Sequence, residues 1–217
     1  MKINRMNLKE VQDYYNSSDS KKYRTSEYFI ERESSISSIL HDCVRTSVLD
    51  IGAGDAFWAK YFIDIIDTYT AIESGEDNCD LITNNLNSSH CKIQVINADA
   101  FYFDYKNISA ETLFLGFFAS HFFNFEIINL LQIINKNIEF KRILILDSYW
   151  SEYRKCKFVT NKFKLQKRIV ETDKKTVEIP KRFISEIDLQ ELSSSLEMNL
   201  EIKFMDEYWC CALLKKE

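Results

Sequence analysis

The alternation of short β-rich runs with longer helical stretches constrains the fold of this chain more than any other feature. From Val48 onward, apolar runs rich in Val, Ile, Leu and Thr are separated by stretches with the spacing of amphipathic helices. The predicted strands are residues 48–51, 69–72, 93–97, 112–117 and 143–146, and the predicted helices are residues 56–66, 77–86 and 125–135. Such alternation is typical of a parallel sheet covered on both faces, with right-handed crossovers.

The two ends of the chain depart from this alternation. The first forty residues predict two helices joined by a polar loop at 16–22. Beyond Asp147 the pattern predicts a hairpin, a helix and an antiparallel pair that closes the sheet. These elements are residues 167–171 and 175–179, then 185–198, then 200–204 and 208–214. The sequence therefore predicts an α/β fold with a seven-stranded, mostly parallel sheet, an antiparallel C-terminal strand and helices on both faces.

Size and composition indicate one domain. The 217 residues are 46% apolar and 28% charged, as in an ordinary globular domain, and no linker or repeat divides them. No run reaches the roughly 18 consecutive apolar residues of a membrane span, and the first residues lack the apolar core of a signal peptide. We therefore expect a cytoplasmic protein with no membrane partner. The six cysteines form no C-x-x-C unit and have no histidine at zinc spacing, so no metal is expected.

The charge is unevenly spread. The whole chain carries −5, yet residues 152–182 contain eleven Lys and Arg against four Asp and Glu. Two interpretations stay open: a basic segment that steers an anionic substrate, or the solvated face of a loop and helix.

Glycine is scarce in this chain and is concentrated at the predicted strand ends. The chain has four glycines, Gly52, Gly54, Gly75 and Gly116, and each follows or ends a predicted strand. Glycine lets the backbone approach a ligand closely, and ligands of open α/β sheets bind beyond the carboxyl ends of the strands. The first loop reads V-L-D-I-G-A-G-D-A-F-W. A dinucleotide fingerprint needs G-x-G-x-x-G, and Phe57 occupies its third glycine position, so a dinucleotide fits badly.

The glycine loop resembles motif I of the class I, Rossmann-like S-adenosylmethionine (SAM)-dependent methyltransferases. In that motif an acidic residue closes strand one and G-x-G-x-G follows; here Ala56 replaces the last glycine. The later segments 115–121 and 142–148 are similar to the small-molecule subgroup. The resemblance implies a Rossmann-like fold, SAM as cofactor, S-adenosylhomocysteine (SAH) as product and no metal. It divides the single domain, 1–217, into an N-terminal helical lid at 1–45, a cofactor-binding core at 46–147, and a substrate insertion with closing strands at 148–217.

The resemblance also implies a set of cofactor residues. Glu73 would accept hydrogen bonds from the ribose hydroxyls, and Asp99 would accept one from the adenine amino group. Asp50 would face the cationic methionine end, where it would repel a pyrophosphate. Taken singly, an acid at a strand end is also typical of a helix N-cap. The predicted cofactor-binding residues are Asp50, Gly52, Ala53, Gly54, Glu73, Ser74, Asp99, Ala100, Phe101 and Phe118.

Catalytic and substrate residues are predicted from location. His121 follows strand four near the methyl-donor end of the crevice, and an imidazole suits proton transfer near neutral pH. It is the predicted general base, with Ser120 beside it; Tyr15 is a second catalytic candidate. Alternatively, His121 caps the next helix or packs among its aromatic neighbours. The predicted substrate-binding residues are Tyr149, Trp150 and Arg182.

The leading functional hypothesis is methyl transfer to an N or O nucleophile of a small metabolite. The alternatives are an RNA or protein methyltransferase that uses the basic segment, and a cofactor-binding protein without activity. The chain lacks the N-P-P-Y-like strand-four motif of adenine- or glutamine-methylating enzymes, so a nucleic acid partner is not expected. The oligomeric state stays open.

Overall fold

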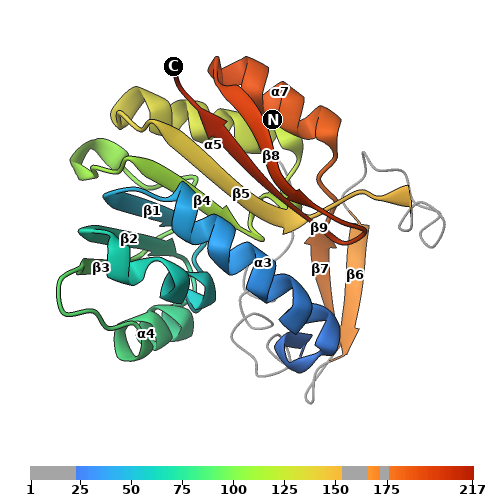
Figure 1. Ribbon diagram of the computed structural model, residues 1–217, viewed down its shortest axis with the longest axis horizontal. Coiled ribbons are helices and arrows are strands. Elements are labelled where there is room, and N and C mark those ends of the chain that lie inside the picture. The colour runs from blue at the N-terminus through green and yellow to red at the C-terminus, as the bar shows by residue number, and fades with distance from the viewer. Residues whose placement is uncertain (1–22, 153–165, 172–175) are drawn as a thin grey trace.

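The structure is a computed structural model that describes residues 23–152, 166–171 and 176–217 (Figure 1). Its centre is a seven-stranded sheet in the order β3-β2-β1-β4-β5-β9-β8. The strands are β1 Ser47–Ile51, β2 Thr68–Glu73, β3 Lys92–Asn97, β4 Thr112–Gly116, β5 Arg142–Ser148, β8 Asn199–Met205 and β9 Trp209–Lys215. The first five strands in the sheet order pair in parallel, and β9 runs antiparallel to both β5 and β8. The predicted α/β fold is confirmed.

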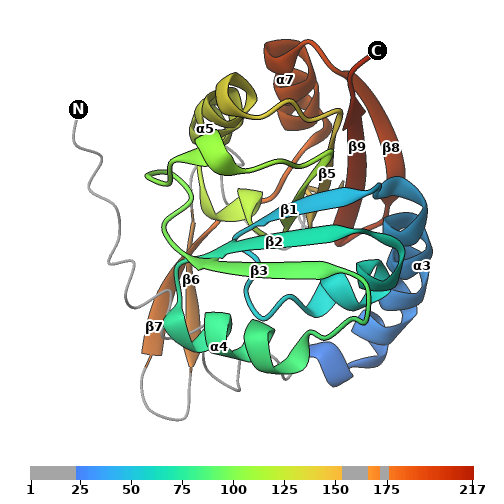
Figure 2. The same cartoon turned by 90° about the vertical axis from the view of Figure 1, so that its left-hand side faces the viewer.

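Helices cover both faces of this sheet. The α-helices are α3 Glu27–Cys43, α4 Glu76–Asn85, α5 Asn124–Asn137 and α7 Glu186–Leu196. Helices α5 and α7 share one core cluster, whereas α3 and α4 contribute to the other. Figures 1 and 2 show α3 on the side of the sheet opposite to α5 and α7. Side chains alternate between the faces along each strand, so Leu49 and Ile51 join the first cluster and Val48 the second.

The N-terminal region is described only from Tyr23. Ser26 caps α3 by accepting the backbone N–H of Phe29, and Ile36 and Leu40 are buried against the sheet. The helix predicted before the 16–22 loop, and that loop itself, lie outside the described residues. A lid function for residues 1–45 stays a prediction.

One predicted helix, residues 56–66, was wrong. This segment forms two short 3-10 helices, η2 Phe57–Tyr61 and η3 Ile63–Ile65. Ala56 adopts a left-handed conformation with φ 54°, and the backbone bonds span three residues, from Phe62 N–H to Ala59 O for example. Aromatic side chains are restricted in a regular helix. Here the Trp58 ring is buried 5.8 Å from the ring of Phe29 on α3, so tertiary packing outweighs the apolar helical spacing.

The predicted hairpin is present beside the sheet. Strands β6 Gln166–Glu171 and β7 Thr176–Lys181 pair antiparallel and form their own two-stranded sheet (Figures 1 and 2). Past β7, Ile184 bridges to Tyr149 just beyond the end of β5. The insertion is therefore anchored at the carboxyl ends of the central strands. Among the described residues, no helix is both long and apolar enough to cross a membrane.

Candidate active site

The glycine loop between β1 and η2 is suspended from the end of β2. The backbone N–H groups of Gly52 and Ala53 donate to the carbonyl of Ile72 at 2.8 and 3.3 Å. Gly52 and Gly54 have φ of 66° and 59°, a conformation that favours glycine. A Cβ on Gly52 would lie 2.2 Å from the Phe118 ring, whereas a Cβ on Gly54 would meet nothing within 4 Å. Gly52 therefore allows a close contact inside the protein, and Gly54 leaves open space above the loop.

Glu73, the last residue of β2, joins this loop to the next one. Its carboxylate accepts the N–H of Gly54 at 2.8 Å through one oxygen and the N–H of Gly75 at 2.7 Å through the other. Burial raises the pKa of Glu73, and the backbone N–H donors oppose that shift. The Ser74 backbone and the Asn78 side chain also donate to this carboxylate. A carboxylate has about four acceptor sites, so a ribose hydroxyl would have to share a site with one of these donors or replace it.

Asp50 lies beneath the loop. It is 2% exposed and accepts a hydrogen bond of 2.7 Å from the hydroxyl of Tyr69, which lies on β2. Burial raises the pKa of Asp50 to about 7, and the bond from Tyr69 opposes the shift. The pocket described next does not include Asp50 in its lining, and a contact of Asp50 with the methionine end of a cofactor stays a prediction.

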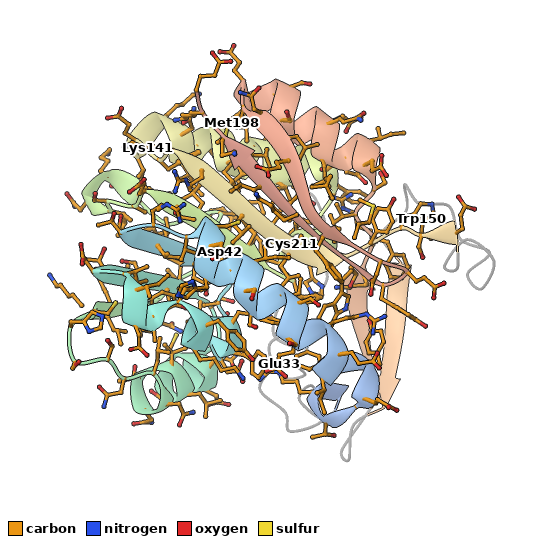
Figure 3. The ribbon with its side chains drawn as sticks, viewed as in Figure 1. Glu33, Asp42, Lys141, Trp150, Met198 and Cys211 are labelled. Carbon is orange, nitrogen blue, oxygen red and sulfur yellow. The ribbon has the colours of Figure 1, made fainter. Side chains whose placement is uncertain are left out.

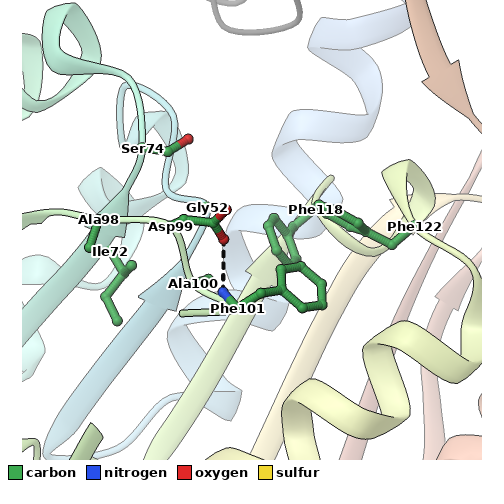
Figure 4. Close-up of a pocket in the computed structure, with 9 residues that line it drawn as sticks. All are labelled: Gly52, Ile72, Ser74, Ala98, Asp99, Ala100, Phe101, Phe118 and Phe122. Atoms are coloured by element: carbon green, nitrogen blue, oxygen red, sulfur yellow. Dashed lines mark hydrogen bonds between the residues drawn. The ribbon is translucent and has the colours of Figure 1, made fainter. Parts of the chain in front are cut away.

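A small pocket opens in front of the glycine loop (Figure 4). Six of the ten predicted cofactor residues line it: Gly52, Ser74, Asp99, Ala100, Phe101 and Phe118. Asp99 accepts the backbone N–H of Phe101 at 2.9 Å. The lining also includes Ile72, Ala98 and Phe122, which sequence reasoning missed. Ile72 ends one predicted strand and Ala98 follows another. Their place at a strand end was the signal that could have identified them as pocket residues.

One wall of the pocket is aromatic. The ring of Phe118 lies 6.3 Å from that of Phe101 in a stacked arrangement, and Phe122 lies 4.8 Å from both. Figure 4 shows these rings on one side and the carboxylate of Asp99 on the other. Aromatic faces favour a planar base, and carboxylates favour amino and hydroxyl donors. These residues fit an adenosine group.

The loop after β4 forms the neighbouring part of the crevice. Phe117 has a φ of 57°, an outlier for so bulky a residue. Ser120 is buried, and its N–H donates to the carboxylate of Asp147 at 2.9 Å. His121 lies half-buried in the short helix η5 Ala119–His121, and its N–H donates to the carbonyl of Phe118.

The predicted substrate residues lie around the anchored insertion. The hydroxyl of Tyr149 donates to Glu186 at 3.2 Å; burial, followed by this carboxylate, raises the pKa of Tyr149 to about 12. Trp150 stacks on Phe183 at 5.8 Å, beyond the end of β5 (Figure 3). The side chain of Arg182 is 4% exposed, and it donates to the carbonyl of Phe122 and to side chains on α5 and α7. The pocket lining includes none of these three residues. Tyr15 lies outside the described residues.

The described part of the chain contains no group of three or more His, Cys, Asp or Glu side chains that could hold a metal ion. The five cysteines that it includes, Cys43, Cys79, Cys91, Cys210 and Cys211, are buried and form no disulfide.

Solved structures share the fold over nearly the whole chain. A DhpI–SAM–HEP complex has a TM-score of 0.79 and 12% identity, covering 99% of this chain and 100% of that one. An S-adenosylmethionine-dependent methyltransferase from Clostridium acetobutylicum ATCC 824 has a TM-score of 0.64 and 10% identity, covering 96% and 98% of the two chains. Magnesium protoporphyrin IX methyltransferase from Synechocystis PCC 6803, solved with bound SAH, has a TM-score of 0.62 and 10% identity, covering 95% and 98%. At these identities the likeness shows the fold.

Sequence comparison identifies the family. No protein of curated function matches the sequence. A family model described as ribosomal RNA adenine dimethylase matches residues 15–141, more than half of the chain. The matched segment contains the glycine loop, Glu73, Asp99 and the loop after β4. The chain therefore belongs to the ribosomal RNA adenine dimethylase family, and with it to the class I S-adenosylmethionine-dependent methyltransferases.

Proposed function

We propose that this protein transfers a methyl group from SAM to an N or O nucleophile of a small metabolite. The observation that carries the choice of acceptor is the loop after β4. Where adenine-methylating enzymes have an N-P-P-Y-like motif, this chain has Leu-Gly-Phe-Phe-Ala at 115–119. These five residues offer no side-chain amide or hydroxyl that could read the edge of a base, and the hydroxyl that follows them, on Ser120, is bonded to Lys181. The family relationship is therefore compatible with a different acceptor.

Cofactor binding is assigned to the pocket residues and the loop above them. Glu73 would accept bonds from the ribose hydroxyls, and Asp99 from the adenine amino group, beside the rings of Phe101 and Phe118. The open space over Gly54 would admit the methionine part of SAM. Ala53 and Ser74 would contribute backbone groups, and Asp50 would support the loop from below through Tyr69. When bound, SAM supplies a methyl group on a sulfonium, which needs no further activation.

The protein's part in the reaction is mainly alignment and removal of a proton. A lone pair on the acceptor N or O forms a bond to the methyl carbon, while the bond from carbon to sulfur breaks. Its electrons stay on sulfur, which leaves neutral SAH. His121 would take the proton that the acceptor loses, an assignment based on its place after β4. An acceptor that is already an oxyanion would need no such base.

RNA is the second candidate acceptor. It is favoured by the family model over residues 15–141 and by the basic segment 152–182, whose Lys and Arg could contact phosphates. Against it stands the absence of the strand-four motif just described.

The test offers the purified protein SAM with an isotopically labelled methyl group. One arm contains a soluble metabolite extract, and the other contains unmethylated ribosomal RNA. We expect label in the small-molecule fraction, where mass spectrometry would identify the product. Label in RNA alone would reject the small-metabolite acceptor, and binding of SAM without turnover in either arm would indicate a protein that binds the cofactor without transferring its methyl group.

A further inference from the structure

Lys181 and Arg182 are neighbours in the chain but have different surroundings. The side chain of Arg182 is 4% exposed and bonded to Phe122, Asn124 and Asp188. The side chain of Lys181 is 12% exposed, and its ammonium donates to the Ser120 hydroxyl at 2.5 Å. At the end of a strand, successive side chains point in opposite directions. One basic residue therefore holds the insertion against the helices, and the other reaches the crevice.

The ammonium of Lys181 lies where ligands of open α/β sheets bind. Ser120 follows β4 and Asp147 belongs to β5, and the ammonium is 3.6 Å from the Asp147 carboxylate. It also lies 5.9 Å from the centre of the Phe117 ring. Phe117 is one of three non-glycine residues of the described chain with a left-handed backbone, with Ala56 and Glu197, and strain of this kind clusters at functional sites. Phe118, the next residue, lines the cofactor pocket.

The charges and hydrogen bonds of this cluster suit an anion. A mostly buried ammonium is costly unless negative charge is close by. Asp147 is fully buried, and its two oxygens accept the N–H groups of Ser120 at 2.9 Å and Ser148 at 2.7 Å. The carboxylate is thus shared between the backbone and the ammonium. Because the Ser120 oxygen accepts a bond from Lys181, its own hydrogen can be donated to another oxygen atom.

We propose that Lys181, held in place by Ser120 and Asp147, binds an acidic group of the methyl acceptor, and that the substrate is therefore a small anion. This inference rests on the proposed function and narrows it to small molecules that carry a carboxylate or a phosphate-type group. Lys181 acts here as a substrate-binding residue.

A purely structural function is the competing explanation, because the same contacts attach the hairpin to the sheet. Arg182 already provides that attachment, since its backbone N–H donates to the Ser120 carbonyl at 2.7 Å and its guanidinium contacts α5 and α7. Loss of Arg182 should therefore lower the melting temperature, and loss of Lys181 should mainly affect substrate binding.

The first experiment needs no activity. Calorimetry with the SAH-bound protein would measure binding of inorganic phosphate and of acetate, which separates phosphate-type from carboxylate preference. We expect one of these anions to bind the wild type, and Lys181→Met to weaken that binding by roughly 10- to 150-fold, the range for a charge-assisted hydrogen bond. SAH affinity should not change. Lys181→Arg should retain part of the binding, and Lys106→Met, on the exposed surface, should retain all of it.

The second experiment uses turnover. Small hydroxy and amino acids, and phosphate monoesters with a free hydroxyl, would each be offered beside the neutral amide or ester of the same compound. We expect methylation of the charged member of a pair, with a KM that rises in Lys181→Met and with added salt. Equal turnover of the neutral member, or an unchanged KM in a folded Lys181→Met protein, would overturn the inference. Methylation of RNA and of none of these compounds would instead refute the proposed function, and phosphate binding would then still report on the Lys181 site separately.

Discussion

The hydroxyl of Tyr69 donates a 2.7 Å hydrogen bond to the carboxylate of Asp50, and both groups are buried beneath the glycine loop. The pair lies on adjacent strands, and Asp50 belongs to the strand from which the loop departs. Any change in the charge of Asp50 therefore acts on the base of the candidate cofactor site.

The first prediction is a pH-dependent stability caused by Asp50. Burial raises its pKa to about 7 in the folded protein, whereas an unfolded aspartate ionises near pH 4. Between these values the folded state holds a proton that the unfolded state has lost, so the free energy of unfolding falls as pH rises from about 4 to about 7. Asp50→Asn keeps an oxygen for Tyr69 without the charge. Urea unfolding should show a flatter pH profile for this variant, with a gain of up to about 4 kcal/mol above pH 7. If the free energy of unfolding of Asp50→Asn fell with pH as steeply as that of the wild type, Asp50 would not be the cause of the pH dependence.

The second prediction concerns Glu73. Its carboxylate fixes the N–H of Gly54 and faces the position assigned to the ribose, so Glu73→Ala should weaken SAM and SAH binding by about 1.5–3 kcal/mol. Calorimetry with the wild type should show no binding of NAD. Glu76→Ala, three residues later and exposed on α4, is the matched control and should leave SAM affinity unchanged. Equal affinities of wild type and Glu73→Ala would exclude Glu73 from the site.

The third prediction contrasts the two glycines of the loop. Gly54→Ala should cost about 1–2 kcal/mol of stability, because the backbone at φ 59° disfavours a side chain that otherwise meets open space. Gly52→Ala should cost more, because its Cβ would also collide with the Phe118 ring. In the Gly52→Ala background, Phe118→Ala should remove the collision between the new Cβ and the ring. The cost of the left-handed backbone at residue 52 should remain. Denaturant unfolding of these three variants and of Phe118→Ala alone forms the test, and equal costs at the two glycines would contradict it.

The fourth prediction separates two functions for His121. A general base predicts that His121→Ala lowers kcat by roughly 10²–10⁴-fold, with SAM affinity and melting temperature little changed. The acidic limb of the pH profile of kcat should disappear as well. His90→Ala, an exposed histidine before β3, is the control. A His121→Ala protein with a lower melting temperature and nearly intact kcat would show that the residue only packs or caps.

Much of the sheet could be predicted because its central strands, β1, β2, β4, β5 and β9, are buried on both faces. Residues 143–146 read Ile-Leu-Ile-Leu and are all fully buried in β5. A continuous apolar run of this length is typical of a strand covered on both faces, so it could be predicted from the sequence. The segment after the glycine loop could not be predicted, because its apolar spacing suits a helix while Trp58 is drawn toward α3 by packing that involves distant residues.

The pocket lining was predictable where it follows strand ends, as with Ser74 and Asp99. The different surroundings of Lys181 and Arg182 were not predictable. Both are basic, and which one faces the crevice depends on how the chain after β7 is joined to the sheet by the bridge between Tyr149 and Ile184. That bridge joins residues that are far apart in the sequence, so no local sequence pattern predicts it.

The replacement of the expected helix by η2 and η3 has an electrostatic consequence. A long helix that began at the glycine loop would aim its macrodipole, equivalent to roughly half a positive charge, at the bound ligand, which favours a pyrophosphate. Segments of five and three residues align few peptide dipoles, and the Asp55 side chain beside them is paired with Arg24 at 2.7 Å. The loop is therefore a weak site for a nucleotide diphosphate, whereas a sulfonium loses nothing there. In this chain the short helices that follow the glycines, and not the glycines alone, set how strongly the loop attracts negative charge.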